Sequence, residues 1–433
     1  MQSMSVFETP ICRRLGIRFP VFQAGMGFVA HAELAAAVSN AGGLGCIGAG
    51  TMNDCELREQ IRLCRAMTDR PFAVDFLFAE IKADKTDNTV VSYTGNVQRL
   101  IDVTFEEKVP VIASGLGNPA GIIKEAHRRG VVVMSLCGNV KQARRLEASG
   151  IDVIIAQGHE AGGHTGRIGT MTLVPQIVDA VRIPVLAAGG IADGRGLLAA
   201  LALGAEGIWM GTRFVASVET YAHVNYKNKI IETDEEGTTI TRCHSGKPCR
   251  LIRNKFTESW VGREAEIEPF PLQSMKYGFP LAEKARYEGK IDEGGLACGQ
   301  TAGLIHSIKP AGQIVRDVMA DAARVLEERF LRPIHRRCRK ACRRSFRGGR
   351  RAGRCWARSI APRILAGYRS RWTGKVPVPC GPKGNWKSSF RPERSRCAAR
   401  SRDLGQWFVC PSQGESPAHP ERESASRCRR KRK

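Results

Sequence analysis

Residues 151–166 read IDVIIAQGHEAGGHTG, an apolar run followed at once by a decapeptide with four glycines and two histidines. A short continuous apolar run is typical of a strand that is buried on both faces of a parallel sheet. The glycines after the run leave backbone without side chains, from which an imidazole can point outward. The stretch therefore predicts a buried strand whose end forms the rim of a cofactor site.

Runs of the same kind recur along residues 1–330, and each is followed by a helical pattern. The eight predicted strands are 20–23, 45–48, 72–76, 109–113, 131–136, 153–156, 184–188 and 207–210. The predicted helices include 32–41, 54–67, 119–129, 140–148, 173–180, 194–203 and an amphipathic closing helix at 312–329. Eight such repeats favour an α/β fold of the TIM (β/α)8 barrel type, with a doubly wound open sheet as the alternative.

Two segments break this rhythm. Residues 213–300 are polar and turn-rich, and we interpret them as an inserted helical lid or small second domain within a barrel domain spanning 1–330. Residues 331–433 carry 30 of the chain's 67 basic residues and 5 of its 42 acidic residues, so they hold the whole net charge of +25. This composition predicts a disordered basic tail. The alternative is that the tail is a nucleic-acid-binding module. It lacks heptads, amphipathic periods and CxxC pairs, so we expect at most non-specific binding of nucleic acid through its charge.

Hydropathy and cysteine spacing also limit the classes of protein to which the chain could belong. No apolar run approaches the ~18 residues that span a bilayer, and the start MQSMSVFETP has neither a basic n-region nor an apolar h-region. We therefore expect a soluble cytoplasmic protein without a membrane partner. The eight cysteines of residues 1–330 lack the spacing of metal ligands, so we expect reduced thiols and no metal site.

The loops after the seventh and eighth predicted strands combine features of a phosphate site. Gly189 and Gly190 lack the Cβ atoms that would keep a phosphate from the backbone N–H groups, and the helix starting near Gly194 adds its positive end. Gly211 and Thr212 supply a second amide and a hydroxyl. Because barrel enzymes often bind phosphate in these two loops, the pair predicts such a site, although a Gly-Gly turn alone is more often just a turn.

The loop after the first predicted strand, QAGMG, suits a flat ring. Ala24 and Gly25 allow a ring to lie against the main chain, and Met26 is polarizable enough to pack on it. The alternative interpretation is a tight turn without a ligand.

The histidines of the opening stretch differ in their neighbours. His164 follows Gly162 and Gly163, has little local packing and is the natural proton acceptor near neutral pH, whereas the alternative is a surface loop histidine. We assign His159 a structural role and expect Glu160 to order the loop by hydrogen bonding to its backbone.

Seven segments, in this order, resemble the nitronate monooxygenase (2-nitropropane dioxygenase) family and its close relative, the flavin-dependent enoyl-[acyl-carrier-protein] reductase II. They are FQAGMG, SNAGGLGCIGAG, RPFAVD, QGHEAGGHTG, AAGGIADGRG, LALGAEGIWMGTRF and CGQTAGLI. The likeness covers about residues 5–330.

The resemblance implies a TIM-barrel flavoprotein that holds FMN non-covalently, with His164 in the place of the catalytic histidine. The flavin contacts that it implies are Gln23, Ala24, Gly25, Met26, Gln157, Gly162, Gly190, Trp209, Met210, Gly211 and Thr212. The family pattern matched by RPFAVD usually ends in Asn, and Asp75 stands there instead. An ionised carboxylate cannot donate a hydrogen bond, so either the flavin edge is met differently or Asp75 is protonated.

For a nitronate monooxygenase, the implied reaction oxidises an alkyl nitronate with O2 to a carbonyl compound and nitrite, without a nicotinamide. In members that accept neutral nitroalkanes, the histidine removes the α-proton. The alternative, an enoyl-ACP reductase, needs reduced nicotinamide and an acyl thioester, and residues 222–230 and 294–305 fit that branch at least as well. We favour the monooxygenase, and leave open whether the chain forms an oligomer.

Overall fold

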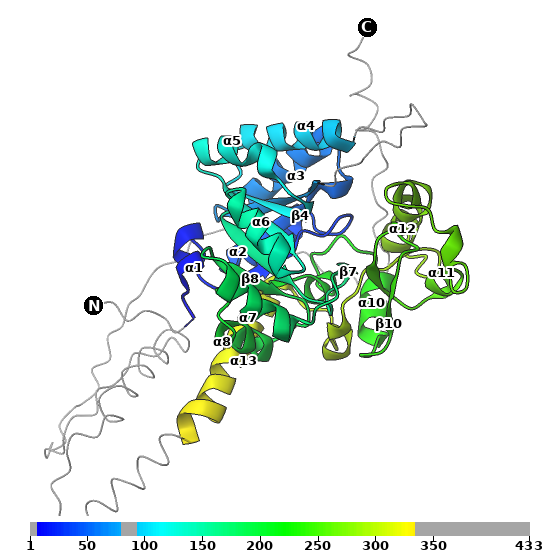
Figure 1. Ribbon diagram of the computed structural model, residues 1–433. Helices are drawn as coiled ribbons and strands as arrows, with labels where there is room; N and C mark the ends of the chain where they lie inside the picture. Colours follow the sequence, from blue (N-terminus) through cyan, green and yellow to red (C-terminus); the bar gives the residue numbers. More distant parts are fainter. Residues whose placement is uncertain (1–6, 79–92, 334–433) are drawn as a thin grey trace, which may run out of the picture. The chain divides into compact units, whose positions relative to one another are not determined.

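The computed structural model describes residues 7–78 and 93–333 (Figure 1). The predicted tail lies outside the described residues from 334 onward, and its expected disorder and non-specific nucleic-acid binding lie there with it. In the described ranges, no helix combines the length and the apolar character that crossing a bilayer requires. All eight cysteines there are free thiols, and seven of them are buried.

Eight parallel strands form the central barrel, in the order β1-β9-β8-β6-β5-β4-β3-β2. The strands are β1 (Val21–Gln23), β2 (Gly45–Gly48), β3 (Phe72–Phe78), β4 (Val111–Gly117), β5 (Val132–Cys137), β6 (Val153–Gln157), β8 (Val185–Ala188) and β9 (Gly207–Met210). A parallel bridge between Phe22 and Leu44 joins the two ends of this order, and the Gln23 N–H donates to the Leu44 carbonyl at 2.9 Å. The predicted barrel is therefore confirmed, and every strand overlaps its predicted range.

Helices surround the barrel because the outward strand residues and the inner helix faces are both apolar. The helices are α1 (Pro10–Leu15), α2 (Ala32–Asn40), α3 (Asp54–Met67), α4 (Tyr93–Glu106), α5 (Ile123–Arg128), α6 (Val140–Ala148), α7 (Thr170–Ala180), α8 (Gly194–Ala202) and α13 (Ala311–Val325). Short 3-10 turns at η1 (Ala49–Thr51) and η2 (Ala120–Ile122) precede α3 and α5, and a π-helical turn η6 (Leu326–Leu331) follows α13. Local capping fixes several starts: Asn53 and Glu56 form a capping box on α3, and the Asn139 side chain accepts from the Gln142 N–H on α6.

The insert contains a small sheet as well as helices (Figure 1). Its helical elements are α9 (Thr212–Val215), α10 (Val224–Glu232), α11 (Lys255–Glu258), η3 (Glu264–Glu266), η4 (Ser274–Gly278), α12 (Phe279–Tyr287) and η5 (Gln300–Leu304). The sheet joins β10 (Thr238–Thr241) and β11 (Cys249–Ile252) to β7 (Gly163–His164), all antiparallel. The insert thus pairs directly with the loop after β6. The predicted limits 213–300 stay an interpretation.

Candidate active site

Small and polar residues occupy the inward positions at the carboxyl ends of the barrel strands. Two residues earlier in the strands, toward their amino ends, the barrel interior is filled by large or apolar side chains that include Phe22, Ile155 and Trp209. The next inward positions, two residues further toward the carboxyl end of the strands, include Ala24, Asp75, Gly115, Gln157, Gly190 and Gly211, with Leu136 of β5 as a larger side chain among them. A layer with so few bulky side chains leaves room for a flat group at the end where barrel enzymes place their sites.

Asp75 is the buried carboxyl group of this layer. Its side chain is only 7% exposed, and Oδ1 has no hydrogen-bond partner. Burial raises the pKa of Asp75 to about 8, although the backbone N–H groups of Gly115 and Phe76 act in the opposite direction. A carboxyl group with this pKa is mostly protonated at neutral pH and can donate a hydrogen bond.

The loop after β1 packs directly on Asp75 and on the loop after β9. A Cβ atom at Gly25 would lie 2.1 Å from the Asp75 Cβ, so only glycine allows this approach. The Met26 sulfur lies 3.6 Å from the position that a Cβ at Gly211 would take. The structure therefore brings together Gly25, Met26, Asp75 and Gly211, which come from three separate strand ends.

The loop after β8 presents backbone rather than side chains. Gly189 and Gly190 both have positive φ, at 92° and 72°, which L side chains rarely adopt. Within the described residues, the N–H groups of Gly190 and Gly211 donate to no protein acceptor. These amides are therefore available to an anion.

The start of α8, in contrast, is already occupied. Asp193 accepts hydrogen bonds from the N–H groups of Arg195 and Gly196 at 2.9 and 3.4 Å, and its carboxylate also pairs with the Arg195 guanidinium. A carboxylate at the N-cap therefore already satisfies two of the amides on which a phosphate at this helix end would depend, and the expected phosphate contact at this helix stays a prediction. Gly194 itself packs against α13, where a Cβ would lie 2.1 Å from the Ala322 nitrogen.

The end of the insert reaches the same region. A Cβ atom at Gly162 would lie 2.6 Å from the Gly299 nitrogen, so this glycine permits a close crossing of two backbones. The Gly299 N–H donates to the Thr212 hydroxyl at 2.9 Å. The Glu160 carboxylate accepts from both the N–H and the hydroxyl of Thr170 at 2.9 Å, so it ties its loop to the start of α7 instead of bonding to the backbone of the loop itself, as the sequence had suggested.

His164 lies on β7, where it pairs with Cys249 of β11. Its Nε2 lies 2.7 Å from the Ser245 hydroxyl, and its backbone carbonyl accepts from the Gln157 amide at 3.0 Å. Burial, and then the positive charges of Lys247 and Arg286, lower the pKa of His164 to about 4. The imidazole is therefore neutral near pH 7, as the sequence predicts, but it is a weaker base than an ordinary histidine.

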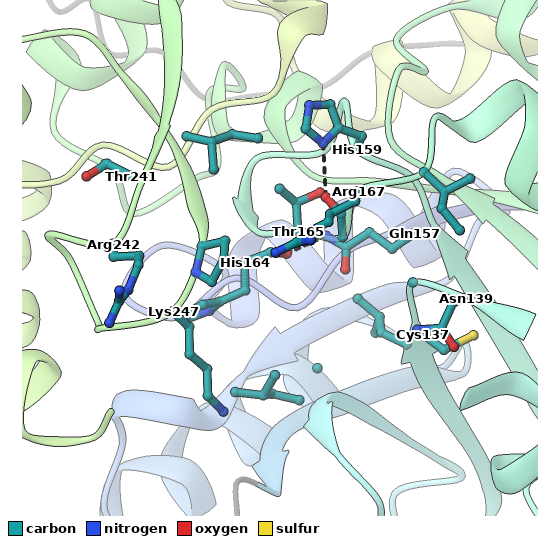
Figure 2. Close-up of a pocket in the computed structure, with 18 of the residues that line it drawn as sticks. Cys137, Asn139, Gln157, His159, His164, Thr165, Arg167, Thr241, Arg242 and Lys247 are labelled. Carbon is teal, nitrogen blue, oxygen red and sulfur yellow. Dashed lines mark hydrogen bonds between the residues drawn. The ribbon is translucent and has the colours of Figure 1, made fainter. Parts of the chain in front are cut away.

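A cavity of about 1540 Å³ opens between the barrel loops and the insert, and Figure 2 shows part of its wall. Gln157 and His164 line it, together with His159, whose Nδ1 lies 3.0 Å from the Gly166 carbonyl. Its charged lining residues are Arg145, Arg167, Arg242, Lys247, Arg253, Glu258 and Glu264. Five cations against two carboxylates give the wall a positive balance that attracts anions.

Two of the implied contacts do not direct their side chains to this end of the barrel. The Gln23 amide is fully buried and exchanges hydrogen bonds of 2.8 and 3.0 Å with the backbone of Cys46. Met210 packs in the apolar layer between strands and helices, whereas its neighbour Trp209 points into the barrel against Phe22.

Ser245 and Lys247, which flank His164, are absent from the sequence-based set. They lie in HSGKP, a turn between the β-branched run TTIT and the apolar run CRLI. Turn residues between two such runs are a hairpin signal, and applying it to residues 238–252 would have indicated β10 and β11. The pairing of that hairpin with β7 has no local signal.

Comparison with known proteins agrees with this architecture. The sequence model of the nitronate monooxygenase family matches residues 8–321. A probable nitronate monooxygenase of Staphylococcus saprophyticus is 34% identical over 74% of this chain and 99% of its own length. A carboxyl-CoA dehydrogenase of Rhodococcus jostii, named for a methyl-oxo-octahydroindene substrate, is 32% identical over 75% of this chain and 98% of its own.

Two solved structures are also similar. FabK from Thermotoga maritima is 40% identical with a TM-score of 0.67, and the match covers 74% of this chain and 98% of that one. The nitroalkane oxidase from Streptomyces ansochromogenes is 30% identical with a TM-score of 0.64, over 71% and 96%. With the family match spanning most of the barrel and the insert, the chain is an oxidoreductase that belongs to the nitronate monooxygenase family.

Proposed function

We propose that the protein is an FMN-dependent nitronate monooxygenase that oxidises alkyl nitronates with O2 to carbonyl compounds and nitrite. The observation that carries the proposal is His164, a neutral imidazole on the wall of a positively charged cavity at the carboxyl end of the barrel. Membership of the family and the likeness to a nitroalkane oxidase support the same reaction class.

The residues at the barrel end fit a flavin mononucleotide. The free N–H groups of Gly190 and Gly211, and the Thr212 hydroxyl beside them, suit its phosphate, since backbone amides without a covering Cβ are the usual cradle. The unpartnered Oδ1 of Asp75 suits a polar edge of the ring system, to which the protonated carboxyl group donates as Asn would. When bound, FMN would supply the electron transfer, which no side chain here performs.

The charge of the cavity favours an anionic substrate. Lys247, Arg242 and Arg167 line the cavity, and Figure 2 shows them on the same part of its wall as His164. The Lys247 Nζ lies 4.1 Å from the centroid of the Phe270 ring, and no carboxylate among the described residues forms an ion pair with it. A nitronate oxygen would meet these cations in a partly dehydrated setting, where the attraction exceeds that in water.

His164 would have a different role with a nitronate than with a neutral nitroalkane. A nitronate has already lost its α-proton, so His164 would orient it and exclude water. A neutral nitroalkane must first transfer the α-proton to the imidazole, and a pKa of about 4 makes that transfer unfavourable. We therefore expect nitronates to be the better substrates.

The first test identifies the cofactor and the product together. The purified chain is expected to release FMN on denaturation and to form nitrite from propionate-3-nitronate or propane-2-nitronate in air. His164→Ala should retain FMN, and should lose about 100-fold or more of its activity with neutral 2-nitropropane. A flavin-free protein, or unchanged turnover of neutral 2-nitropropane in His164→Ala, would refute the proposal.

A second candidate function is an FMN- and NAD(P)H-dependent enoyl-ACP reductase. The observation in its favour is the cavity, whose 1540 Å³ exceed the ~300–1,000 Å³ typical of small-molecule sites and far exceed a short nitronate. Trp260, Val261 and Ile267 of the insert give it an apolar wall that suits an acyl chain. The likeness to FabK and to a CoA-thioester dehydrogenase points the same way.

A further inference from the structure

Ser245 is buried, at 1% exposure, in the turn that connects β10 to β11. Its hydroxyl oxygen accepts the Lys247 N–H at 3.3 Å and lies 3.5 Å from the Lys247 carbonyl. Gly246 takes a φ of 80°, and a Cβ there would lie 2.6 Å from the Glu268 carbonyl oxygen. The hydroxyl is therefore held in place by a tight turn that other parts of the insert pack against.

His164 is fixed at its backbone by the other side of the same small sheet. Register pairing with Cys249 and the hydrogen bond from the Gln157 amide position its main chain. The side chain keeps its rotations about χ1 and χ2, and the 2.7 Å contact between Nε2 and the Ser245 hydroxyl restricts them. The two groups lie 81 residues apart in sequence, so this contact exists only when the insert docks.

The second ring nitrogen of His164, Nδ1, is free to contact a ligand in the cavity. Within the described residues, Nδ1 of His164 has no hydrogen-bond partner, and this atom is not fully buried. We infer that Ser245 is a positioning residue that holds His164 by Nε2, so that Nδ1 is the atom that takes the α-proton of a neutral nitroalkane. This inference rests on the proposed function for the identity of the proton donor.

The protons balance along this chain of contacts. In the neutral state Nε2–H donates to the Ser245 hydroxyl, whose own proton points toward the Lys247 carbonyl, and Nδ1 carries the lone pair. The substrate's α-C–H bond then breaks, its electron pair stays on the nitroalkane to give the nitronate, and the proton binds Nδ1. The imidazolium keeps the same Nε2–H contact, so no hydroxyl has to turn during the step.

The neighbouring charges explain why a hydroxyl suits this place. The titratable groups that face His164 are Lys247, Arg286, His244, whose ring centroid is 6.5 Å away, and the Cys249 thiol on the paired strand. Among the described residues no carboxylate contacts the ring, in contrast to the acid that commonly orients a catalytic imidazole. A serine orients the ring without adding a negative charge that would favour the protonated form.

The test compares Ser245→Ala with Ser245→Thr, which keeps a hydroxyl, and with Ser259→Ala. Ser259 is an exposed serine of the same insert. Its hydroxyl donates to the Phe256 carbonyl and takes no part in the proposed proton transfer. In the FMN-loaded enzyme, Ser245→Ala should lower kcat with neutral 2-nitropropane by about 10- to 100-fold, because a misplaced base loses its alignment. Turnover of preformed propane-2-nitronate should fall less than threefold, and Ser245→Thr should recover part of the loss.

Nitrogen-15 NMR of histidine-labelled protein gives a readout that does not depend on activity. The wild-type protein should show His164 as the neutral tautomer protonated at Nε2, and Ser245→Ala should show a mixture of tautomers. A wild-type tautomer protonated at Nδ1, or equal losses with both substrates, would overturn the inference. If neither substrate is turned over, the proposed function fails, and the tautomer measurement still decides the role of Ser245.

Discussion

Replacing Asp75 by Asn should stabilise the protein, and more so as the pH rises. The pKa of this carboxyl group is about 8 in the folded protein against 3.8 for an ordinary aspartate, because burial disfavours its charged form. The unfolded chain therefore releases the proton above about pH 4, whereas the folded protein retains it until about pH 8. Between these values the folded state binds more protons than the unfolded state, so the wild-type protein loses stability as the pH rises.

The size of the effect follows from the shift. Each pH unit inside this window costs about 1.4 kcal/mol, so the wild type should lose about 2 kcal/mol between pH 6 and pH 8 through Asp75. Asn has nearly the same shape, bears no charge, and donates a hydrogen bond as the protonated acid does. The advantage of Asp75→Asn should therefore grow by about 2 kcal/mol over this range, or by about 3 °C in Tm for a folded unit of this size.

The assay is urea and thermal unfolding of both proteins at pH 6, 7 and 8. Asp102→Asn serves as a matched control, because Asp102 is exposed on α4, where it accepts from the Gln98 amide. The control should show no pH-dependent gain. A constant difference between Asp75→Asn and wild type from pH 6 to pH 8 would refute the assignment of a protonated Asp75.

Three further predictions concern the same end of the barrel. Gly25→Ala should lose flavin binding and stability, because its Cβ would lie 2.1 Å from that of Asp75. The control Gly121→Ala, whose Cβ would have no neighbour within 4 Å, should lose neither, and equal flavin content in the two variants would contradict this prediction. Lys247→Met should raise KM for a nitronate about fivefold through loss of roughly 1 kcal/mol of charge attraction. It should also move the acid limb of kcat/KM for 2-nitropropane to higher pH, because burial first, and then the charge of Lys247, lower the pKa of His164. In the wild type that limb should lie near pH 4, with His164 neutral and active above it; a limb near pH 6.5 would show that the imidazole is not dehydrated.

The barrel was predictable because its signals are local. Each parallel strand is buried on both faces and reads as an unbroken apolar run, such as VIIAQ at β6. The position of His164 on the cavity wall was predictable for the same reason, since the glycine-rich loop that carries it follows that strand, and its catalytic role stays a prediction. Asp75 was singled out by its match to a family pattern that usually ends in Asn, but its protonation depends on burial by other segments, such as the loop after β1 that packs on it at Gly25.

The remaining features depend on contacts between distant segments. Ser245 and Lys247 join the site because β11 pairs with the two residues of β7, a contact that no local pattern contains. At the start of α8, Asp193 is both the N-cap residue and a carboxylate, and its side chain takes two of the amides that a phosphate would use. An N-cap signal considered together with the Gly-Gly turn would have predicted this contact.

The central claim is that this site oxidises nitronates, and one comparison tests it most directly. The FMN-loaded full-length chain is given propionate-3-nitronate in air without nicotinamide, and in parallel a crotonyl thioester with NADH or NADPH. We predict nitrite release with consumption of O2 in the first reaction, and only slow nicotinamide oxidation in the second. Rapid thioester-dependent oxidation of NADH or NADPH without nitrite from the nitronate would contradict the account and establish the reductase.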